Sequence, residues 1–157
     1  MTEPRRTDPT TMTREEMRAF NTAMVDRIRA AEPQPYAEEC YVLRVVHVCG
    51  RHSGQLRTFP IAVTQLDCRR YLCAPHRGRD WVRNLLAAGN CRVERDPVPD
   101  HRAVLVDGDE AAPVVAAYLR KLDRPTNQWP FRPDAPVSEI RQHTDQLAIF
   151  RLEPEAD

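Results

Sequence analysis

The sequence predicts one mainly β domain of the α+β class, an antiparallel β-barrel with peripheral helices. Two observations predict it. Short runs rich in β-branched and aromatic residues recur between turn residues, as in small barrels. Helical stretches are too few to connect these strands as the crossovers of a parallel sheet. The 157 residues suffice for one core, so we expect a disordered leader over 1–12 and a single domain over 13–157.

Each expected element has a local signal. Thr13 and Glu16 form a capping-box pattern that begins a helix over 14–31, and two prolines at 33 and 35 prevent it from continuing. Asp80 is the expected N-cap of a short helix that ends at Gly89. A further helix is expected over 110–121. The runs that predict strands are 40–49, 58–66, 69–75, 91–96, 102–108 and 146–154.

Composition excludes several classes of function. The 23 basic and 23 acidic residues cancel, which argues against a nucleic-acid-binding protein with its basic excess. Five cysteines without metal-ligand spacing predict reduced thiols and no metal site. No apolar run reaches the roughly 20 residues of a membrane span. The expected protein is cytoplasmic, acts on a small molecule, and is either a monomer or a homodimer.

The loop "GRHSGQLRT" (50–58) carries more charge and more bare backbone than a hairpin turn requires. Gly50 and Gly54 can adopt positive φ, so that main-chain N–H groups form an anion-binding nest. Ser53 adds a hydroxyl, and Arg51 and Arg57 add forked cationic donors. The loop therefore favours an anion-binding site, while a solvated hairpin tip is the alternative.

A second basic stretch, "PHRGRDWVRNL" (75–85), lies just before and within the second expected helix. Its histidine and arginines precede a helix N-terminus, which itself attracts anions. Trp81 and Asn84 are three residues apart and share a face of this helix. The indole of Trp81 therefore faces either a ligand or the core.

These segments carry a resemblance. "FNTAMVDRIRAAE", "VCGRHSGQLRTFPIAV", "YLCAP", "GRDWVRNLLAAGNCRVE" and "IFRLEP" occur in the order typical of the deazaflavin-dependent nitroreductase family. The resemblance covers about residues 20–152, and its most specific parts are "GRHSGQLR" and "WVRNL". It implies a split β-barrel of the FMN-binding-like type, an oxidoreductase activity and the deazaflavin coenzyme F-420. FMN remains an alternative cofactor on the same fold.

The resemblance also implies which residues contact the coenzyme. The loop would hold its phosphate and acidic tail through Arg51, His52, Ser53, Gly54 and Arg57. The ring would lie beside Phe59, Pro60, Ala74, Pro75, His76 and Arg77, with Trp81 and Asn84 on the neighbouring helix. His52 replaces the lysine usual in the family, which weakens this contact at neutral pH. The segment 74–81 is also shorter than its common form.

The segment before the last strand gives the expected substrate site. "TNQWPFRP" stands where family members often have a tyrosine-rich segment, and the catalytic proton donor is unknown. Trp129, Phe131 and Arg132 would bind a planar conjugated acceptor such as an enone or quinone, an intermediate of biosynthesis. A hydrophobic plug on the barrel is the alternative for the two aromatic residues. A non-catalytic coenzyme-binding module and a barrel that performs another reaction without a cofactor also remain open.

Overall fold

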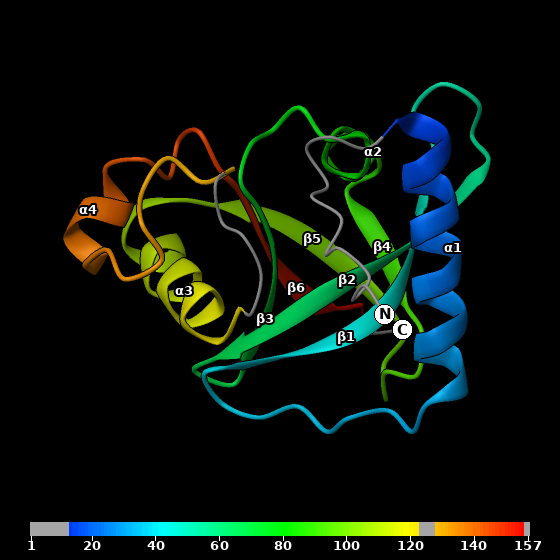
Figure 1. Cartoon of the computed structure of the whole chain (residues 1–157), viewed down its shortest axis with the longest axis horizontal. Coiled ribbons are helices and arrows are strands. Elements are labelled where there is room, and N and C mark those ends of the chain that lie inside the picture. The colour runs from blue at the N-terminus through cyan, green and yellow to red at the C-terminus, as the bar shows by residue number, and fades with distance from the viewer. Residues whose placement is uncertain (1–12, 123–127, 156–157) are drawn as a thin grey trace, which may run out of the picture.

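Six antiparallel strands close into a barrel in the computed structural model, which describes residues 13–122 and 128–155 (Figure 1). The order around the barrel is β1-β2-β3-β6-β5-β4. The expected fold class is thus confirmed, whereas the expected leader over 1–12 lies outside the described residues. The strands are β1 (Cys40–Cys49), β2 (Leu56–Leu66), β3 (Arg69–Ala74), β4 (Asn90–Val93), β5 (Asp100–Val106) and β6 (Ala148–Pro154).

Alternation along the strands builds two apolar clusters. On β3, Leu72 and Ala74 join a cluster supplied by β1, β2, β4 and β6, which fills the barrel. Their neighbours Tyr71 and Cys73 point the other way, into a cluster with α3 (Gly108–Lys121). One strand therefore serves both the barrel interior and a helix packed on the outer wall.

Helix α2 (Asp80–Ala88) packs against the barrel cluster through the fully buried Val82 and Leu85. It ends at Gly89, whose φ of 76° forms the left-handed C-cap that the sequence predicts. The short helix α4 (Val137–Arg141) packs beside α3 and was not expected from the sequence. At five residues it is too short to show helical periodicity.

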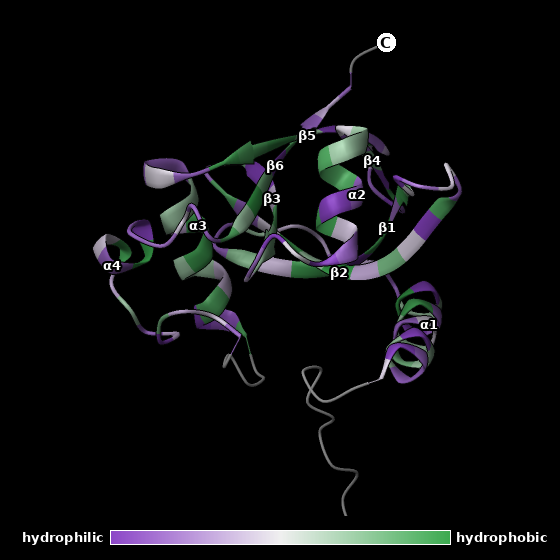
Figure 2. Cartoon of the chain, turned by 90° about the horizontal axis from the view of Figure 1, so that it is seen from above, coloured by the Kyte–Doolittle hydropathy of each residue, from purple (hydrophilic) through white to green (hydrophobic). Residues whose placement is uncertain are grey.

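Helix α1 (Arg14–Ala30) stands at the side of the barrel, and Figure 2 shows both hydrophilic and hydrophobic residues on it. Its expected capping box is present. The turn after β4 fixes its other end, because Arg95 donates to the carbonyl of Ala31 at 2.6 Å and also to that of Arg29. Arg29 in turn donates to Glu94 at 2.6 and 3.0 Å. No helix among the described residues is long and apolar enough to cross a membrane.

Several expected boundaries were wrong. Strand β2 begins two residues earlier, at 56, and Pro75 lies beyond the end of β3. Strand β4 ends at Val93 rather than 96, because Arg95 has a left-handed φ of 60° that breaks the extended backbone. Strand β5 covers 100–106, and α3 begins at 108. The N-cap of α2 is Arg79, and Asp80 instead occupies the first turn of the helix.

Candidate functional site

The turn between β1 and β2 is held by its own main chain. The Gly50 N–H donates to the Gln55 carbonyl at 2.8 Å, and the Gly54 N–H donates to the Gly50 carbonyl at 3.0 Å. Ser53 Oγ accepts from the Gln55 N–H at 3.2 Å. These amides already have partners, so the expected anion-binding nest is not available from them. The turn uses those donors for its own closure.

The two glycines have different functions in this turn. Gly54 has the expected positive φ, 70°, with open space around it. Gly50 does not, and it is buried. A Cβ at Gly50 would lie 3.2 Å from Arg57 Nε and 3.3 Å from Ser53 Oγ, so this glycine permits close approach of both side chains.

Arg51 connects the turn to α2. Its main-chain N–H and its Nη1 both donate to Asn84 Oδ1, at 3.1 and 2.8 Å. Nη1 also lies 3.4 Å from the Asp80 carbonyl oxygen, and Nη2 lies 3.5 Å from the Asp80 carboxylate. The Arg51 side chain is only 23% exposed, because these contacts hold it against α2. Asn84 is 6% exposed, and its amide oxygen holds the turn in place.

Several polar side chains of the turn remain open to solvent. His52, Ser53 and Arg57 are exposed. Neither His52 nor Arg57 makes an ion pair within residues 13–122 and 128–155. An unpaired guanidinium and a hydroxyl on a fixed turn are suitable ligands for a phosphate or carboxylate.

The segment from β3 to α2 is ordered by hydrogen bonds. Ala74 and Pro75 are buried, and His76 is exposed. His76 Nδ1 accepts from the Gly78 N–H at 3.1 Å. Burial, and then the positive charge of Arg79, lower the pKa of His76, which favours its neutral form. Arg77 Nε donates to the Leu147 carbonyl at 2.8 Å, which ties this segment to the residue before β6.

Trp81 lies over the end of the barrel cluster. Its ring stacks on Phe59 with centroids 5.6 Å apart and planes 22° apart, and its centroid is 6.0 Å from that of Phe150. Phe59 is 8% exposed, whereas Trp81 and Pro60 are half-buried. The indole therefore belongs partly to the core and still presents an aromatic surface to solvent.

The aromatic residues of the expected substrate site are largely packed. Phe131 is 7% exposed and joins the α3 cluster, with its ring 5.6 Å from that of His143. Trp129 is half-buried and lies between Tyr118 and Phe131, at 6.0 and 6.1 Å. Burial of Phe131 agrees with the hydrophobic-plug alternative, whereas Trp129 keeps part of its ring exposed. The Arg132 side chain is 88% exposed and lies 3.6 Å from Asp134.

Hydrogen bonds bring three separate stretches of sequence to one place. Arg51 joins the β1–β2 turn to α2 through Asn84. Arg79, next to α2, donates to the side chain of Gln128, beside Trp129. The sequence analysis assigned no function to Gln128, and it did not predict that Asn84 Oδ1 accepts hydrogen bonds from Arg51. No local pattern identifies either contact, because their partners are 33 to 49 residues away.

The site has a strongly positive character. Residues 50–58 and 76–84 contain five arginines and one aspartate. No group of three or more metal-ligating side chains occurs among the residues that the structure describes. The arrangement can therefore hold an anion through side chains and place a flat molecule near Trp81.

Comparisons with known proteins establish the fold and no more. The chain is similar to a domain-swapped dimer at 19% identity, with 93% of this chain and 100% of that chain covered and a TM-score of 0.51. This likeness supports the split-barrel α+β fold. No protein-family model matches the sequence, and no curated protein matches it either.

Two further solved structures are more distant. One is a reductase dependent on reduced coenzyme F-420, at 19% identity, covering 71% of this chain and 93% of that chain, with a TM-score of 0.46. The other is a heme binding protein from Mycobacterium smegmatis, at 17% identity, with a TM-score of 0.42. That match covers 70% of this chain, which spans 45% of the other protein's length.

Proposed function

We propose that this protein is an oxidoreductase that binds the deazaflavin coenzyme F-420 between the β1–β2 turn and α2. The observation that supports the proposal most directly is the Arg51–Asn84 contact. It fixes the exposed His52, Ser53 and Arg57 beside the helix that carries Trp81. A coenzyme with a flat ring and an anionic tail requires this combination of cationic and aromatic groups.

The residues that present free donors would hold the anionic part of the coenzyme. In this proposal Arg57 and Ser53 contact phosphate or carboxylate oxygens directly, and His52 adds a weaker contact. Arg51 and Asn84 act as positioning residues, since their polar atoms already bond to each other. Gly54 provides the left-handed turn that presents these side chains.

The ring would lie against the half-buried surface around Trp81. Phe59, Ala74 and Pro75 form a firm apolar support because all three are buried, and Pro60 and His76 border it. When bound, the coenzyme supplies a hydride. The protein's contribution is to orient the ring against an acceptor and to exclude water from that surface. Arg77 contributes indirectly, by holding this segment against the Leu147 carbonyl.

The proposed acceptor is a planar conjugated molecule with an activated C=C bond, such as an enone or quinone. Trp129 offers partly exposed flat apolar surface, and Phe131 supports it from within the α3 cluster. The largely exposed Arg132 is a cation that could stabilise negative charge developing on the acceptor oxygen. Under this proposal, reduction of nitro compounds is incidental.

Binding titrations of variants test the proposal. Wild type, Arg57→Ala and the control Arg92→Ala, an exposed arginine on β4, are titrated with coenzyme F-420 and with FMN. Arg57→Ala should weaken coenzyme F-420 binding by about 1.5–3 kcal/mol, and Arg92→Ala should leave it unchanged. Saturable binding of FMN alone would identify a flavin enzyme instead, because FMN has one phosphate and needs fewer cations. Binding of neither would contradict both cofactor assignments.

We also propose that the protein can form a homodimer, and a solved structure of the same fold that is a domain-swapped dimer supports this proposal. Light scattering at several protein concentrations tests this. A monomer mass at every concentration would contradict it.

A further inference from the structure

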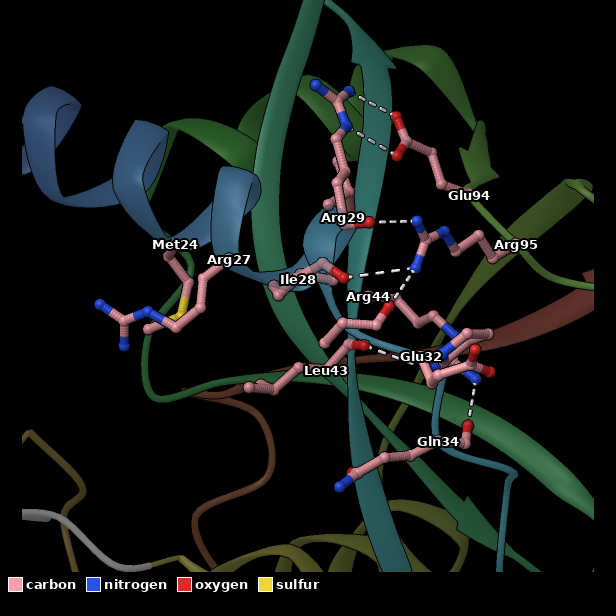
Figure 3. Close-up of a pocket in the computed structure, with 13 residues that line it drawn as sticks. Met24, Arg27, Ile28, Arg29, Glu32, Gln34, Leu43, Arg44, Glu94 and Arg95 are labelled. Carbon is pink, nitrogen blue, oxygen red and sulfur yellow. Dashed lines mark hydrogen bonds and ion pairs between the residues drawn. The ribbon is translucent and has the colours of Figure 1, made fainter.

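A cavity lies between α1 and the outer face of β1, apart from the proposed coenzyme site. Its volume is about 300 Å³, at the lower end of the range for ligand pockets. Met24 and Ile28 from α1 and Leu43 and Val45 from β1 give it apolar walls (Figure 3). Leu43 remains 41% exposed, although it lies on a strand covered by a helix. None of these residues belongs to the proposed coenzyme site.

Arg44, which also lines the cavity, is a buried cation without a counter-ion. It is 4% exposed, and its guanidinium donates only to the carbonyls of Leu43 and Gln34. Its Nε is buried and has no hydrogen-bond partner. Across the described chain no carboxylate lies within ion-pair distance of Arg44.

The nearest buried carboxylate is already engaged. Asp96 accepts from the Tyr36 hydroxyl at 2.7 Å and pairs with Arg70 at 3.6 Å. Arg44 and Arg70 both lie over the Tyr36 ring, at 4.8 and 3.7 Å, but among the described residues Asp96 forms an ion pair with Arg70 alone. Burying an uncompensated charge is unfavourable, and a bound anion would offset that cost.

The other charges around the cavity leave it net positive. Arg29 is neutralised by Glu94, and Arg95 is bonded to the last carbonyls of α1. Arg27 on the rim is exposed and has no ion-pair partner within the described residues. Glu32 is the one acidic side chain there without a described partner. Figure 3 shows the Arg27 guanidinium extended away from Ile28 and Leu43, so its side chain must turn to reach a ligand.

From these observations we propose that this cavity binds an amphipathic carboxylate, a free single-chain acid of about eight to ten carbons. The chain length follows from the volume of the cavity. A water molecule occupies about 30 Å³ in the liquid and a methylene group a similar volume, so 300 Å³ accommodates about ten such groups. The chain lies along Met24, Ile28 and Leu43. The carboxylate is attracted by the buried charge of Arg44 and contacted by Arg27 at the rim.

Calorimetric titration with three decyl compounds tests the head group. Decanoate, below its micelle concentration, should bind the full-length protein at one site. Decanol should bind at least about tenfold more weakly, and decyltrimethylammonium should not bind. Equal affinity for decanol and decanoate, or saturable binding of none of them, would overturn the proposal. So would binding to phosphatidylglycerol vesicles without binding of monomeric decanoate.

Matched variants locate the site. Leu43→Trp should fill the cavity and abolish binding, whereas Val137→Trp, on a residue 42% exposed, should not. Arg27→Glu should weaken decanoate binding about tenfold, and the control Arg18→Glu on the same helix less than twofold. Arg44→Met should remove the preference for decanoate over decanol. Because Arg44→Met can fail to fold, Arg27→Glu provides the second test: unchanged affinity in that folded variant contradicts the assignment.

Discussion

Replacing Arg51 and Asn84, singly and together, measures how much free energy the contact between them contributes to folding. This contact places the basic turn beside α2. Arg51→Ala removes the 2.8 Å bond from Nη1 to Asn84 and the weaker contacts to Asp80. The hydrogen bond to Asn84 has a charged donor whose side chain is only 23% exposed, so it contributes to stability. The ion pair with Asp80 adds little to stability, because the Asp80 carboxylate is 72% exposed. We expect the free energy of unfolding to fall by about 1–2 kcal/mol, and Tm by about 3–6 °C.

Asn84→Ala should cost more, about 2–3 kcal/mol, because it also leaves the Arg51 main-chain N–H without its acceptor. Urea denaturation of the four proteins gives the coupling free energy between the two side chains. We expect about 1–1.5 kcal/mol of favourable coupling. Arg92→Ala, the exposed control, should stay within about 0.5 kcal/mol of wild type. Additive single effects, to within about 0.3 kcal/mol, would refute the idea that these residues hold the turn.

Three further predictions concern other parts of the molecule. The Arg29 guanidinium, with a contribution from His47, lowers the pKa of Glu94 to about 2, so the Arg29–Glu94 contact stabilises the fold above pH 4.5 and is lost as pH falls toward 2. Glu94→Gln should lower the free energy of unfolding by about 2 kcal/mol at pH 7, a value reduced for solvent screening because the Glu94 side chain is 23% exposed. If the variant were still less stable than wild type by the same amount at pH 2, this explanation would be contradicted. Gly89→Ala should lower the free energy of unfolding by about 1 kcal/mol, as measured by urea denaturation. The cost comes from the left-handed φ of 76°, since no atom lies within 4 Å of the new Cβ. An unchanged free energy of unfolding would show that the α2 cap tolerates a side chain. His52→Lys should raise coenzyme F-420 affinity at pH 8, because lysine carries a full positive charge there, whereas unchanged affinity would place His52 away from the anion.

Local signals predicted most elements of the barrel. The capping box at Thr13 and the C-cap at Gly89 were both found, because such signals depend on residues close in sequence. Strand ends were less predictable. The left-handed turn at Arg95 ends β4 early, and the arginine there caps a helix more than 60 residues away. A tertiary contact of that kind leaves no local pattern.

The candidate site was predictable in its composition and less so in its hydrogen bonds. The basic turn and the tryptophan helix are visible in the sequence. Which arginine remains free is not, since Arg51 and Arg57 differ only in what the fold places beside them. The same holds for Phe131, whose burial depends on the packing of α3.

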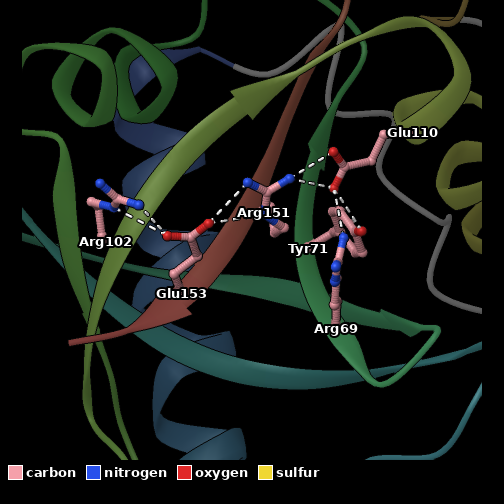
Figure 4. A network of polar contacts seen from close by, with 6 residues as sticks. All are labelled: Arg69, Tyr71, Arg102, Glu110, Arg151 and Glu153. Atoms are coloured by element: carbon pink, nitrogen blue, oxygen red, sulfur yellow. Dashed lines mark hydrogen bonds and ion pairs between the residues drawn. The ribbon is translucent and has the colours of Figure 1, made fainter. Parts of the chain in front are cut away.

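Surface ion pairs show why the number of arginines in the sequence does not predict which of them are available to a ligand. Figure 4 shows a row in which Arg102 and Arg151 share Glu153, and Arg151 continues to Glu110 at 2.6 Å. Tyr71 also donates to Glu110, at 3.0 Å. These arginines link β3, β5, β6 and α3 on the outer wall and are therefore structural. An arginine such as Arg57, which has no ion-pair partner among the described residues, remains available to a ligand.

Single-turnover mixing with reduced coenzyme F-420 tests the proposed activity most directly. The reduced coenzyme and protein are mixed without oxygen against a cyclic enone, a quinone, a nitroaromatic compound and a simple aldehyde, and oxidation of the coenzyme is followed by absorbance. We predict fast oxidation with the enone or quinone, slower oxidation with the nitroaromatic compound, and a large loss of rate in Arg57→Ala at subsaturating coenzyme. Oxidation confined to the aldehyde, or no oxidation with any acceptor although the coenzyme binds, would contradict the proposed hydride transfer to a conjugated acceptor.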